Sequence, residues 1–303
     1  VGSVGEVARK LGRDDVHVVS NPEFLREGTA VADFLHPDRV VIGAADDEVG
    51  KRVATLYSGL PGEILITDPA SAETIKYASN AFLATKISFV NAIAAVCEAV
   101  GADVNDVVLG MGYDKRIGNA FLRPGPGWGG SCFPKDSHAL VRIAEDAGYD
   151  FGLLKGVIDV NEDQFARVAD KIERMAGGSV DGKVVAVWGL TFKARTDDLR
   201  DSPSLNIVGR LRQRGARIQA YDPSLEDASD PRLEGIEVTP DPYAATAGAD
   251  VLAILTEWDE FKWLDFDKVG ENMAQKRVVD GRNLVDRTGL VRRGFTYEGI
   301  GRS

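Results

Sequence analysis

Residues 124–136, Pro-Gly-Pro-Gly-Trp-Gly-Gly-Ser-Cys-Phe-Pro-Lys-Asp, place a cysteine directly behind a glycine-rich loop. A helical pattern opens at Pro134 and runs to Gly148, so Cys132 is expected at the N-terminal edge of a helix. The backbone N–H groups and the dipole at such an end favour a thiolate. Lys135 adds a cation, and Asp136 is about one helical turn from the sulfur, within reach of it. These residues predict a nucleophilic thiolate at the floor of a pocket.

The second cysteine, Cys97, occupies a different setting. It falls among valine, isoleucine and alanine on an apolar helical face, which is typical of a small buried hydrophobe. The histidines, His17, His36 and His138, lack metal-ligand spacing to one another or to cysteine, so no metal site is expected. A thiol hydrolase pairing Cys132 with His138 is disfavoured, because a spacing of six residues puts them on nearly opposite sides of one helix.

Polar residues with possible chemistry also occur in the first third of the chain. Asn21–Gly28 follows a predicted strand and carries two carboxylates and an arginine, in what is either a ligand site or a solvated turn. Lys76 and Asn80 are four residues apart, so they share one helical face and could hold an oxyanion. Solvent exposure is the plainer interpretation of that pair.

Two turns near the C-terminus follow predicted strands. Gly189-Leu190-Thr191-Phe192-Lys193 has a single glycine and is no dinucleotide fingerprint, although its backbone N–H groups and Lys193 could take a phosphate. Asp280-Gly281-Arg282-Asn283 places an arginine at the same edge of the sheet.

The elements that must position these residues are of α/β type. Strands are expected at Val16–Ser20, Arg39–Ile42 and Ile64–Asp68, and one apolar helical pattern covers residues 70–100. The 30 residues from Ser71 to Val100, which include no proline or glycine, would span about 45 Å, so the helix should link two domains or pack against a second chain. Short helices follow, and after Asp181-Gly182 strands are expected at Val184–Gly189, Ala216–Asp222, Val251–Thr256 and Arg277–Asp280, with parallel-sheet character.

Composition sets outer limits on the function. The 303 residues suggest two domains or slightly more, and a hydrophobic content of 44% is enough for ordinary cores. The net charge of −11 argues against broad nucleic-acid or membrane-surface binding. Two cysteines form no disulfide framework, no uninterrupted apolar run approaches membrane-span length, and no signal peptide is apparent, so a cytoplasmic protein is expected.

Several of these segments together resemble the UDP-glucose/GDP-mannose dehydrogenase family, and its UDP-glucose 6-dehydrogenases in particular. They occur in the family's order and cover essentially the whole chain: Asn21–Gly28, Lys76 with Asn80, Arg116-Ile117-Gly118, residues 124–136, Gly189–Lys193, Thr196–Arg200 and Asp280–Asn283. The Gly-Gly-Ser-Cys-Phe-Pro-Lys-Asp block is the most specific.

The resemblance implies three domains. Residues 1–68 would be the remnant of a Rossmann-like NAD-binding domain, 69–178 a central long-helix dimerisation domain, and 179–303 a second Rossmann-like, UDP-sugar-binding domain. The family begins with a strand and a Gly-x-Gly-x-x-Gly turn that binds NAD. This chain begins at Val1 inside a helical pattern without that fingerprint, so its front is expected to be missing and its own turnover reduced or absent.

The resemblance also implies the chemistry. Family members oxidise the sugar C6 alcohol of UDP-glucose to an acid with two NAD⁺. Cys132 would form a thiohemiacetal and then a thioester, Lys76 and Asn80 would stabilise the oxyanion, and Glu23 and Asp136 would position and deprotonate water, with Glu23 as the general acid/base. Substrate contacts would come from Phe24, Leu25, Phe121, Leu122, Gly129, Phe192, Lys193 and Arg282, and from an Arg116 that reaches a neighbouring subunit, which implies a homodimer. Glu27, Lys135 and Arg200 would contact NAD.

Two alternatives remain open. A GDP-mannose-type enzyme shares the cysteine and the two-step oxidation, although the Pro-Gly-Pro-Gly-Trp-Gly-Gly loop and Phe133 favour the UDP-glucose type. A chain without the NAD fingerprint could also be a non-catalytic module that binds a UDP-sugar and dimerises.

Overall fold

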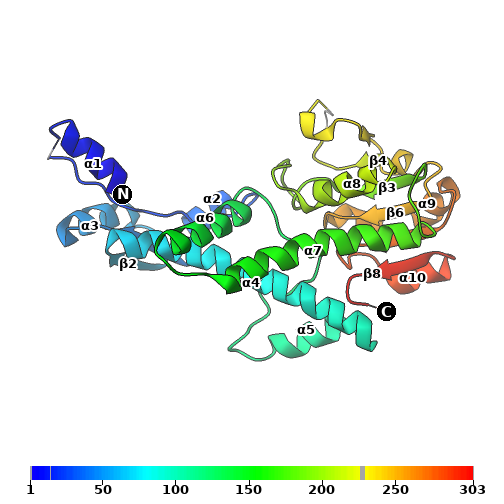
Figure 1. Cartoon of the computed structure of the whole chain (residues 1–303), viewed down its shortest axis with the longest axis horizontal. Coiled ribbons are helices and arrows are strands. Elements are labelled where there is room, and N and C mark those ends of the chain that lie inside the picture. The colour runs from blue at the N-terminus through cyan, green and yellow to red at the C-terminus, as the bar shows by residue number, and fades with distance from the viewer. Residues whose placement is uncertain (1, 14, 226–228, 303) are drawn as a thin grey trace. The chain divides into compact units, whose positions relative to one another are not determined.

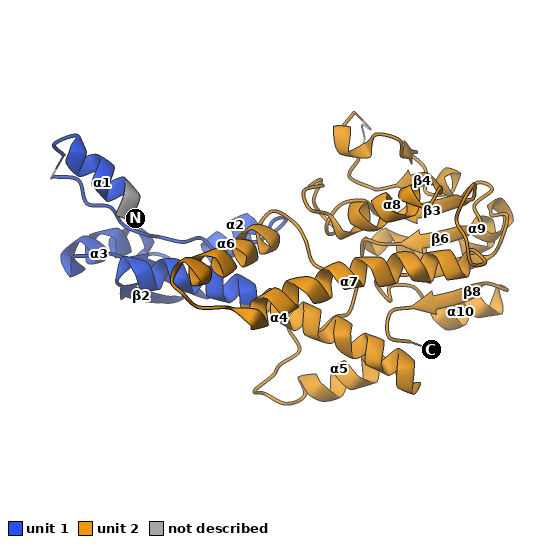
Figure 2. Cartoon of the chain, in the orientation of Figure 1, with its two compact units in different colours: residues 1–81 blue, residues 82–303 orange. Residues whose placement is uncertain are grey.

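A computed structural model describes residues 2–13, 15–225 and 229–302 of the chain. It divides into two compact units, shown in different colours in Figure 2. Unit 1 ends at Ala81 and unit 2 begins at Phe82. The long helix α4, Pro69–Val100, contributes to both units.

Unit 1 is built around two parallel strands. It contains α1 (Gly2–Lys10), α2 (Ala30–Leu35), β1 (Arg39–Gly43), α3 (Asp47–Ala54), η1 (Thr55–Tyr57) and β2 (Glu63–Thr67). β1 pairs in parallel with β2, with Arg39 opposite Glu63 and Gly43 opposite Thr67. Each of the two strands expected there is confirmed.

The prediction of a strand at Val16–Ser20 is wrong. This segment makes one antiparallel bridge, between Ser20 and Gly43, and no ladder. The amide of Val16 instead donates to the Arg13 carbonyl in a turn, and Pro22 brings no N–H to extend the pairing beyond Ser20. An apolar run becomes a strand only when its backbone groups find a partner strand.

Helix α4 confirms the expected long helix at residues 70–100. By length and composition alone it could cross a membrane, with a mean hydropathy of 1.5 over its most apolar window, of which 33% is buried. No uninterrupted apolar run marks this helix in the sequence, because polar residues such as Ser88 and Asn91 interrupt the run, although its mean hydropathy stays high.

Among the residues of unit 2 that the structure describes, six parallel strands form a sheet in the order β5-β4-β3-β6-β7-β8 (Figure 1). They are β3 (Val184–Trp188), β4 (Arg217–Tyr221), β5 (Glu237–Val238), β6 (Val251–Ile254), β7 (Arg277–Asp280) and β8 (Thr296–Gly299). The four strands expected from the sequence are confirmed, and the two edge strands β5 and β8 are additional. Strand order reverses between β3 and β6, and ligands of such sheets bind beyond the carboxyl ends of the strands at that point.

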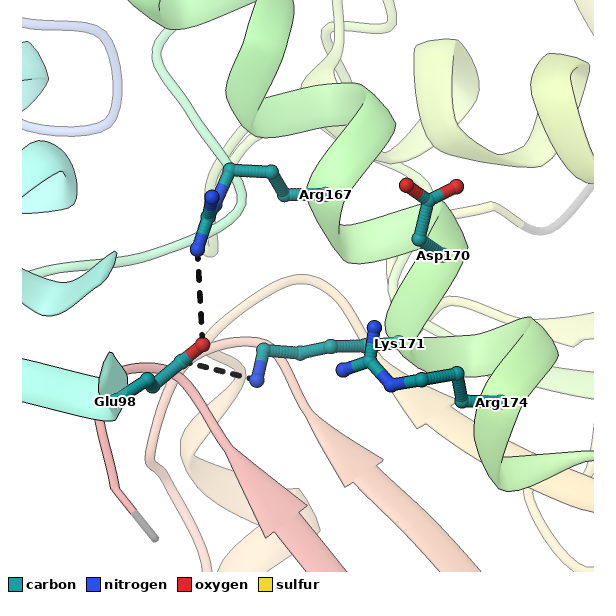
Figure 3. A pocket seen from close by; sticks show the side chains of 5 residues that line it. All are labelled: Glu98, Arg167, Asp170, Lys171 and Arg174. Carbon is teal, nitrogen blue, oxygen red and sulfur yellow. Dashed lines mark ion pairs between the residues drawn. The ribbon is translucent and has the colours of Figure 1, made fainter. Parts of the chain in front are cut away.

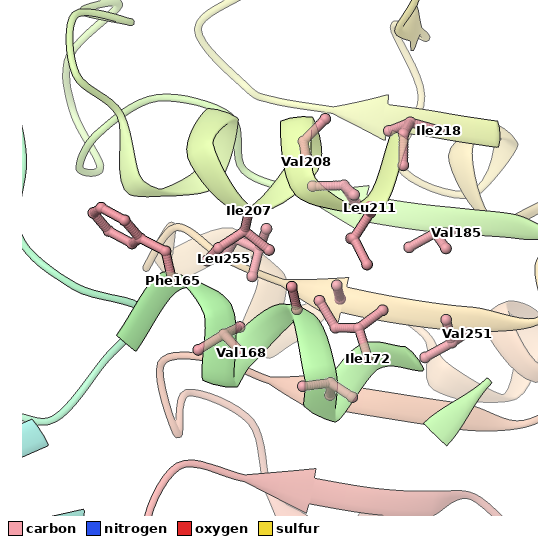
Figure 4. Packing of buried hydrophobic residues seen from close by; sticks show 14 of the residues in the cluster. Phe165, Val168, Ile172, Val185, Ile207, Val208, Leu211, Ile218, Val251 and Leu255 are labelled. Atoms are coloured by element: carbon pink, nitrogen blue, oxygen red, sulfur yellow. The ribbon is translucent and has the colours of Figure 1, made fainter. Parts of the chain in front are cut away.

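Helices pack on both faces of this sheet. They are α7 (Gly152–Met175) and α8 (Pro203–Gln213) on one face and α9 (Phe266–Asn272) and α10 (Arg287–Arg292) on the other. Unit 2 also contains α5 (Val104–Gly112) and α6 (Phe133–Asp146), and short 3₁₀ turns. Figure 4 shows the core on one face, where Phe165, Val168 and Ile172 of α7 meet Ile207 and Leu211 of α8 and side chains from the strands. A second core around Trp188, Phe261 and Phe266 covers the other face.

Charged side chains join α4 and α7 in unit 2 (Figure 3), and Glu298 of β8 extends this group. Lys171 has only 6% of its side chain exposed, and its Nζ lies 2.9 Å from Glu98 Oε1 and 2.7 Å from Glu298 Oε1. A buried ammonium requires such partners, since an uncompensated buried charge is strongly destabilising. Arg167, Asp170 and Arg174 complete the lining of a small cavity here, and the cavity contains none of the predicted site residues.

The C-terminal segment fastens to the same end of α4. The amide of Gly301 donates to Glu98 Oε1 over 2.7 Å, and the Gly301 carbonyl accepts from the Val104 amide over 2.9 Å. The Arg302 guanidinium lies 3.1 Å from Asp103 Oδ2. Backbone and side-chain bonds together therefore attach the chain end to the start of α5.

Candidate functional site

Cys132 lies at the N-cap of α6, as the sequence predicts. Its carbonyl accepts the amide of Asp136 over 2.9 Å, which closes the first turn of the helix. The Sγ atom lies 3.7 Å from Ser131 Oγ, and the residue is partly exposed. The Asp136 side chain is almost fully buried, and its Oδ1 lies 3.5 Å from Lys135 Nζ. Cys97, by contrast, is 3% exposed within the apolar core, as expected.

The glycines before Cys132 are required by close packing. A Cβ at Gly129 would lie 1.9 Å from the carbonyl oxygen of Asp201, and one at Gly130 would lie 2.8 Å from the ring of Phe192. Gly130 also has φ +80°, a conformation that disfavours side chains, and its amide donates to Asp201 O over 3.3 Å. The structure therefore brings the cysteine loop directly against the Gly189–Lys193 turn and the residues that follow it.

Four buried polar side chains form hydrogen bonds to the glycine-rich loop before Cys132, and the sequence analysis did not predict them. From α4, Asn91 Oδ1 accepts the Gly125 amide, and Ser88 Oγ accepts the Trp128 indole N–H, each over 2.8 Å. From α7, Gln164 donates to the Gly125 carbonyl, and Asn161 bonds both peptide groups of Trp128. Their signal in the sequence is two polar pairs, each spaced by three residues, within otherwise apolar helical faces.

Arg282 and Phe192 meet beside the same loop. The Arg282 Nε donates to the Leu255 carbonyl over 2.8 Å and lies 3.0 Å from Glu257 Oε2. Its other end lies against the loop, because a Cβ at Gly125 would be 3.2 Å from Nη1. Lys193 Nζ sits 5.2 Å from the centre of the Phe192 ring. Two cations and an aromatic face are thus gathered where an anionic, ring-bearing ligand could bind.

Asp280 shapes the turn that carries Arg282. Its fully buried carboxylate accepts the amides of Arg282, Leu284 and Val285 over 3.0, 2.7 and 2.9 Å. Burial raises the pKa of Asp280, and these amide bonds oppose the rise. Arg282 is therefore fixed at both ends. Asp280 binds its backbone amide, and Leu255 and Glu257 bind its guanidinium group.

The idea that the backbone of the Gly189 turn takes a phosphate is wrong. The amides of Leu190 and Thr191 already donate to Asp222 Oδ2, over 2.8 and 3.0 Å. The Thr191 hydroxyl and the Trp258 indole N–H point to the same oxygen. Asp222 is 3% exposed, so an internal carboxylate occupies the position that a phosphate would take. The role expected of the Lys193 side chain does not depend on these amides.

Unit 1 brings together two other predicted residues, Glu23 and Lys76. The Lys76 ammonium lies 3.0 Å from Glu23 Oε1 and donates to the Glu23 carbonyl over 2.6 Å. The exposed fraction is 18% for the Lys76 side chain and 55% for that of Glu23, so the lysine is held while the carboxylate remains accessible. One turn further along α4, Asn80 is buried. Asn21 anchors the segment by donating to the Val41 carbonyl of β1.

The remaining predicted residues are spread over both units. In unit 1, the Phe24 ring lies beneath the Arg39 guanidinium, Leu25 donates its amide to Glu23, and Glu27 is partly buried. In unit 2, Leu122 is buried and the Phe121 ring lies 6.4 Å from that of Phe133.

Arg116 and Arg200 are exposed arginines, each paired with a carboxylate two residues before it. Arg116 bonds Asp114 and thereby lowers the pKa of Asp114. Arg200 lies 2.9 Å from Asp198 Oδ2. Both guanidinium groups are therefore oriented but remain open to solvent on one side.

Comparison with known proteins identifies the family. Residues 2–60, 70–163 and 186–287 match the NAD binding, central and UDP binding domains of the UDP-glucose/GDP-mannose dehydrogenase family. The chain is 45% identical over its whole length to the UDP-glucose 6-dehydrogenase of Rhizobium meliloti (strain 1021), of which it covers 71%. It is 46% identical to UDP-glucose 6-dehydrogenase TuaD of Bacillus subtilis (strain 168), again over its whole length and over 65% of that protein.

A solved structure agrees with this result. The UDP-glucose dehydrogenase of the hyperthermophilic archaeon Pyrobaculum islandicum superposes with a TM-score of 0.88 at 37% identity, over 98% of this chain and 67% of that one. The chain thus spans about two thirds of the length of its relatives and matches all three of their domain types. From its cysteine loop, its parallel sheet and these relatives, the chain belongs to the UDP-glucose/GDP-mannose dehydrogenase family.

Proposed function

We propose that this chain serves the NAD-dependent, two-step oxidation of UDP-glucose to UDP-glucuronate, with Cys132 as the nucleophile. One observation carries the proposal: a free, partly exposed cysteine at the N-cap of α6, behind a glycine loop packed against Phe192 and Arg282. A helix N-terminus favours a thiolate, and adjacent cations and an aromatic ring suit a nucleoside diphosphate.

Cys132 would hold the reacting carbon. Its sulfur would add to the C6 aldehyde to give a thiohemiacetal, and the second oxidation would leave a thioester. Covalent capture explains how a reactive aldehyde stays bound between the two oxidations. Asp136, whose side chain is 2% exposed one turn along α6, would take part in holding the water that ends the cycle.

Glu23, Lys76 and Asn80 would serve the oxygen atoms of the same intermediate. Lys76 supplies a fixed positive charge and Asn80 an amide donor, which suits them to a developing oxyanion. Glu23 is the proposed general acid/base for thioester hydrolysis. Its ion pair with Lys76, at 3.0 Å, orients the carboxylate, while its exposure leaves it accessible to water.

The nucleotide would be held chiefly by unit 2. Arg282 and Lys193 provide the positive charge for the diphosphate, and Phe192 provides an apolar face. Phe121, Leu122 and Gly129 are further proposed substrate contacts, on the segment before Cys132, and Phe24 and Leu25 are the substrate contacts proposed for unit 1. The Asp222 carboxylate excludes the Gly189 turn from this task, so the side chains must carry it.

The cofactor is proposed to be NAD, which when bound accepts hydride from the sugar C6. Lys135 and Arg200 have exposed side chains, 74% and 60%, and their charge fits a dinucleotide pyrophosphate. Glu27 is the third proposed contact, through hydrogen bonds to the cofactor. These residues would bind and orient NAD rather than react.

A homodimer is proposed to form across the central segment, within a three-part organisation of residues 1–68, 69–178 and 179–303. Phe82, Phe89 and Val96 recur every seven residues on α4 and are 64%, 50% and 54% exposed. This apolar face, which gives α4 its membrane-like composition, suits burial against a second copy. The exposed guanidinium of Arg116 is proposed to reach the neighbouring subunit's substrate.

The test is NADH formation when the purified chain is mixed with UDP-glucose and NAD⁺, with UDP-glucuronate measured as product. Cys132→Ala should abolish acid formation and leave UDP-glucose binding intact. Unchanged turnover in Cys132→Ala would reject the nucleophile. Binding of UDP-glucose without NADH formation would favour the non-catalytic module, and a preference for GDP-mannose would favour the sister enzyme. Two free thiols suit a cytoplasmic location, which fractionation of cells would test.

A further inference from the structure

Trp128 is held at three points by two buried polar side chains. Asn161 Oδ1 accepts the Trp128 amide over 2.8 Å, and Asn161 Nδ2 donates to the Trp128 carbonyl over 3.0 Å. Ser88 Oγ accepts the indole N–H over 2.8 Å. Asn161, Ser88 and Trp128 are 4%, 2% and 5% exposed. A buried side-chain amide that satisfies both peptide groups of one residue cannot be replaced by an apolar group without leaving those groups unpaired.

Trp128 in turn contacts the first residue of α6. Its indole lies 6.4 Å from the Phe133 ring at an angle of 80°, an edge-to-face packing. Phe133 directly follows Cys132, so the position of the indole sets the first turn of the helix whose N-cap is Cys132. A route of direct contacts therefore runs from Asn161 on α7 through Trp128 and Phe133 to the cysteine.

The glycines between Trp128 and Cys132 make this route stiff. Gly129 and Gly130 are enclosed by Asp201 and Phe192, with no room for even a Cβ. Two of the three residues that separate Trp128 from Cys132 are thus packed on their other side as well. A loop held this way transmits a shift at Trp128 instead of absorbing it.

We propose that Asn161 is a positioning residue for the Cys132 thiol: by clamping both peptide groups of Trp128, it keeps the cysteine half-sheltered at the start of α6. The nucleophilic use of that thiol rests on the proposed function, whereas the positioning itself does not. Ser88 contributes to the same clamp through the indole N–H.

The experiment is alkylation with iodoacetamide, followed by peptide mass spectrometry that reports Cys132 and Cys97 separately. Cys97 is 3% exposed and serves as an internal gauge of global unfolding. The variants are Asn161→Ala, which removes both bonds, and Asn161→Asp, which keeps the acceptor for the Trp128 amide and places an acceptor oxygen where the donor to the Trp128 carbonyl was.

The matched control is Asn283→Ala. Asn283 clamps Ile300 in the same way, donating to its carbonyl over 2.8 Å and accepting its amide over 2.9 Å. The Asn283→Ala substitution therefore removes the same kind of bond pair at a different residue of unit 2.

Asn161→Ala should alkylate at Cys132 several-fold faster than the unmodified chain, with Cys97 unchanged. Asn161→Asp should also alkylate faster at Cys132 than the unmodified chain, because it too loses the bond to the Trp128 carbonyl, and Asn283→Ala should leave Cys132 at its original rate. An unchanged or slower Cys132 rate in Asn161→Ala would overturn the proposal, and so would parallel acceleration of Cys97, which would show global loosening. The alkylation rate is measured without NAD or UDP-glucose. The result therefore tests the positioning of Cys132 even if the proposed enzymatic function is wrong.

Discussion

Replacing Gly129 with alanine tests whether the cysteine loop has any freedom to move. The new Cβ would lie 1.9 Å from Asp201 O and 2.8 Å from Pro203 Cδ, while ordinary contact begins near 3.4 Å, so the displacement required is 3.4 − 1.9 = 1.5 Å. Asp201 cannot yield easily, because the Ser202 hydroxyl that follows it is buried and donates to the Leu190 carbonyl over 2.6 Å. The loop must therefore move.

The cost can be estimated from that displacement. Overpacking of this kind costs about 1–3 kcal/mol, and loss of the Gly130 amide bond to Asp201 adds about 1 kcal/mol. At about 2–4 °C per kcal/mol, the melting transition of unit 2 should fall by roughly 4–16 °C. A shift above 1 Å near a reacting atom should also lower kcat by about 100-fold or more.

Scanning calorimetry and the rate of UDP-glucuronate formation are the assays. Gly209→Ala is the matched control, because a Cβ there meets nothing within 4 Å inside α8 and should stabilise the chain by about 0.4–1 kcal/mol. A Gly129→Ala protein that melts and turns over like Gly209→Ala would refute the packing argument.

Other consequences concern the acid/base, the nucleotide site and the dimer. Glu23→Gln should slow thioester hydrolysis and let an adduct on Cys132 accumulate; intact-mass spectrometry that finds no adduct at a normal rate would contradict the assignment. Arg282→Ala should weaken UDP affinity by about 10- to 100-fold, as expected for one charge-assisted contact, and unaltered calorimetric titration would reject that contact. Phe89→Glu should give a monomer in light scattering, whereas Trp263→Glu, at an 84% exposed position, should not; a dimer that survives Phe89→Glu would place the interface elsewhere.

Sequence reasoning succeeded where a signal is local. Helix α4 and the four central strands of unit 2 have clear periodicity or continuous apolar runs, and the helical pattern that opens at Pro134 predicts the N-cap position of Cys132. Sequence reasoning failed where pairing with another strand decides whether a segment becomes a strand. Val16–Ser20 has the composition of a strand but makes a single bridge, and β5, with two residues, exists only because β4 lies beside it.

The site shows the same division. The types of Lys76 and Glu23 suggested chemistry, but only the fold reveals their ion pair, since 53 residues separate them. Asp222 follows a strand by one residue and resembles any strand-end aspartate. Its role as an internal anion for the Gly189 turn depends on contacts 31 and 32 residues away in sequence.

The attachment of the chain end to α4 has a consequence for the order of biosynthesis. Lys171 is made 298 − 171 = 127 residues before its partner Glu298. At the usual rate of synthesis, 5–20 residues per second, Glu298 is added about 6–25 s after Lys171. Gly301, which bonds both Glu98 and Val104, comes later still. The central helices therefore emerge from the ribosome before the strand that completes their charge pairing, and this part of unit 2 can close only after β8 and Gly301 have been made.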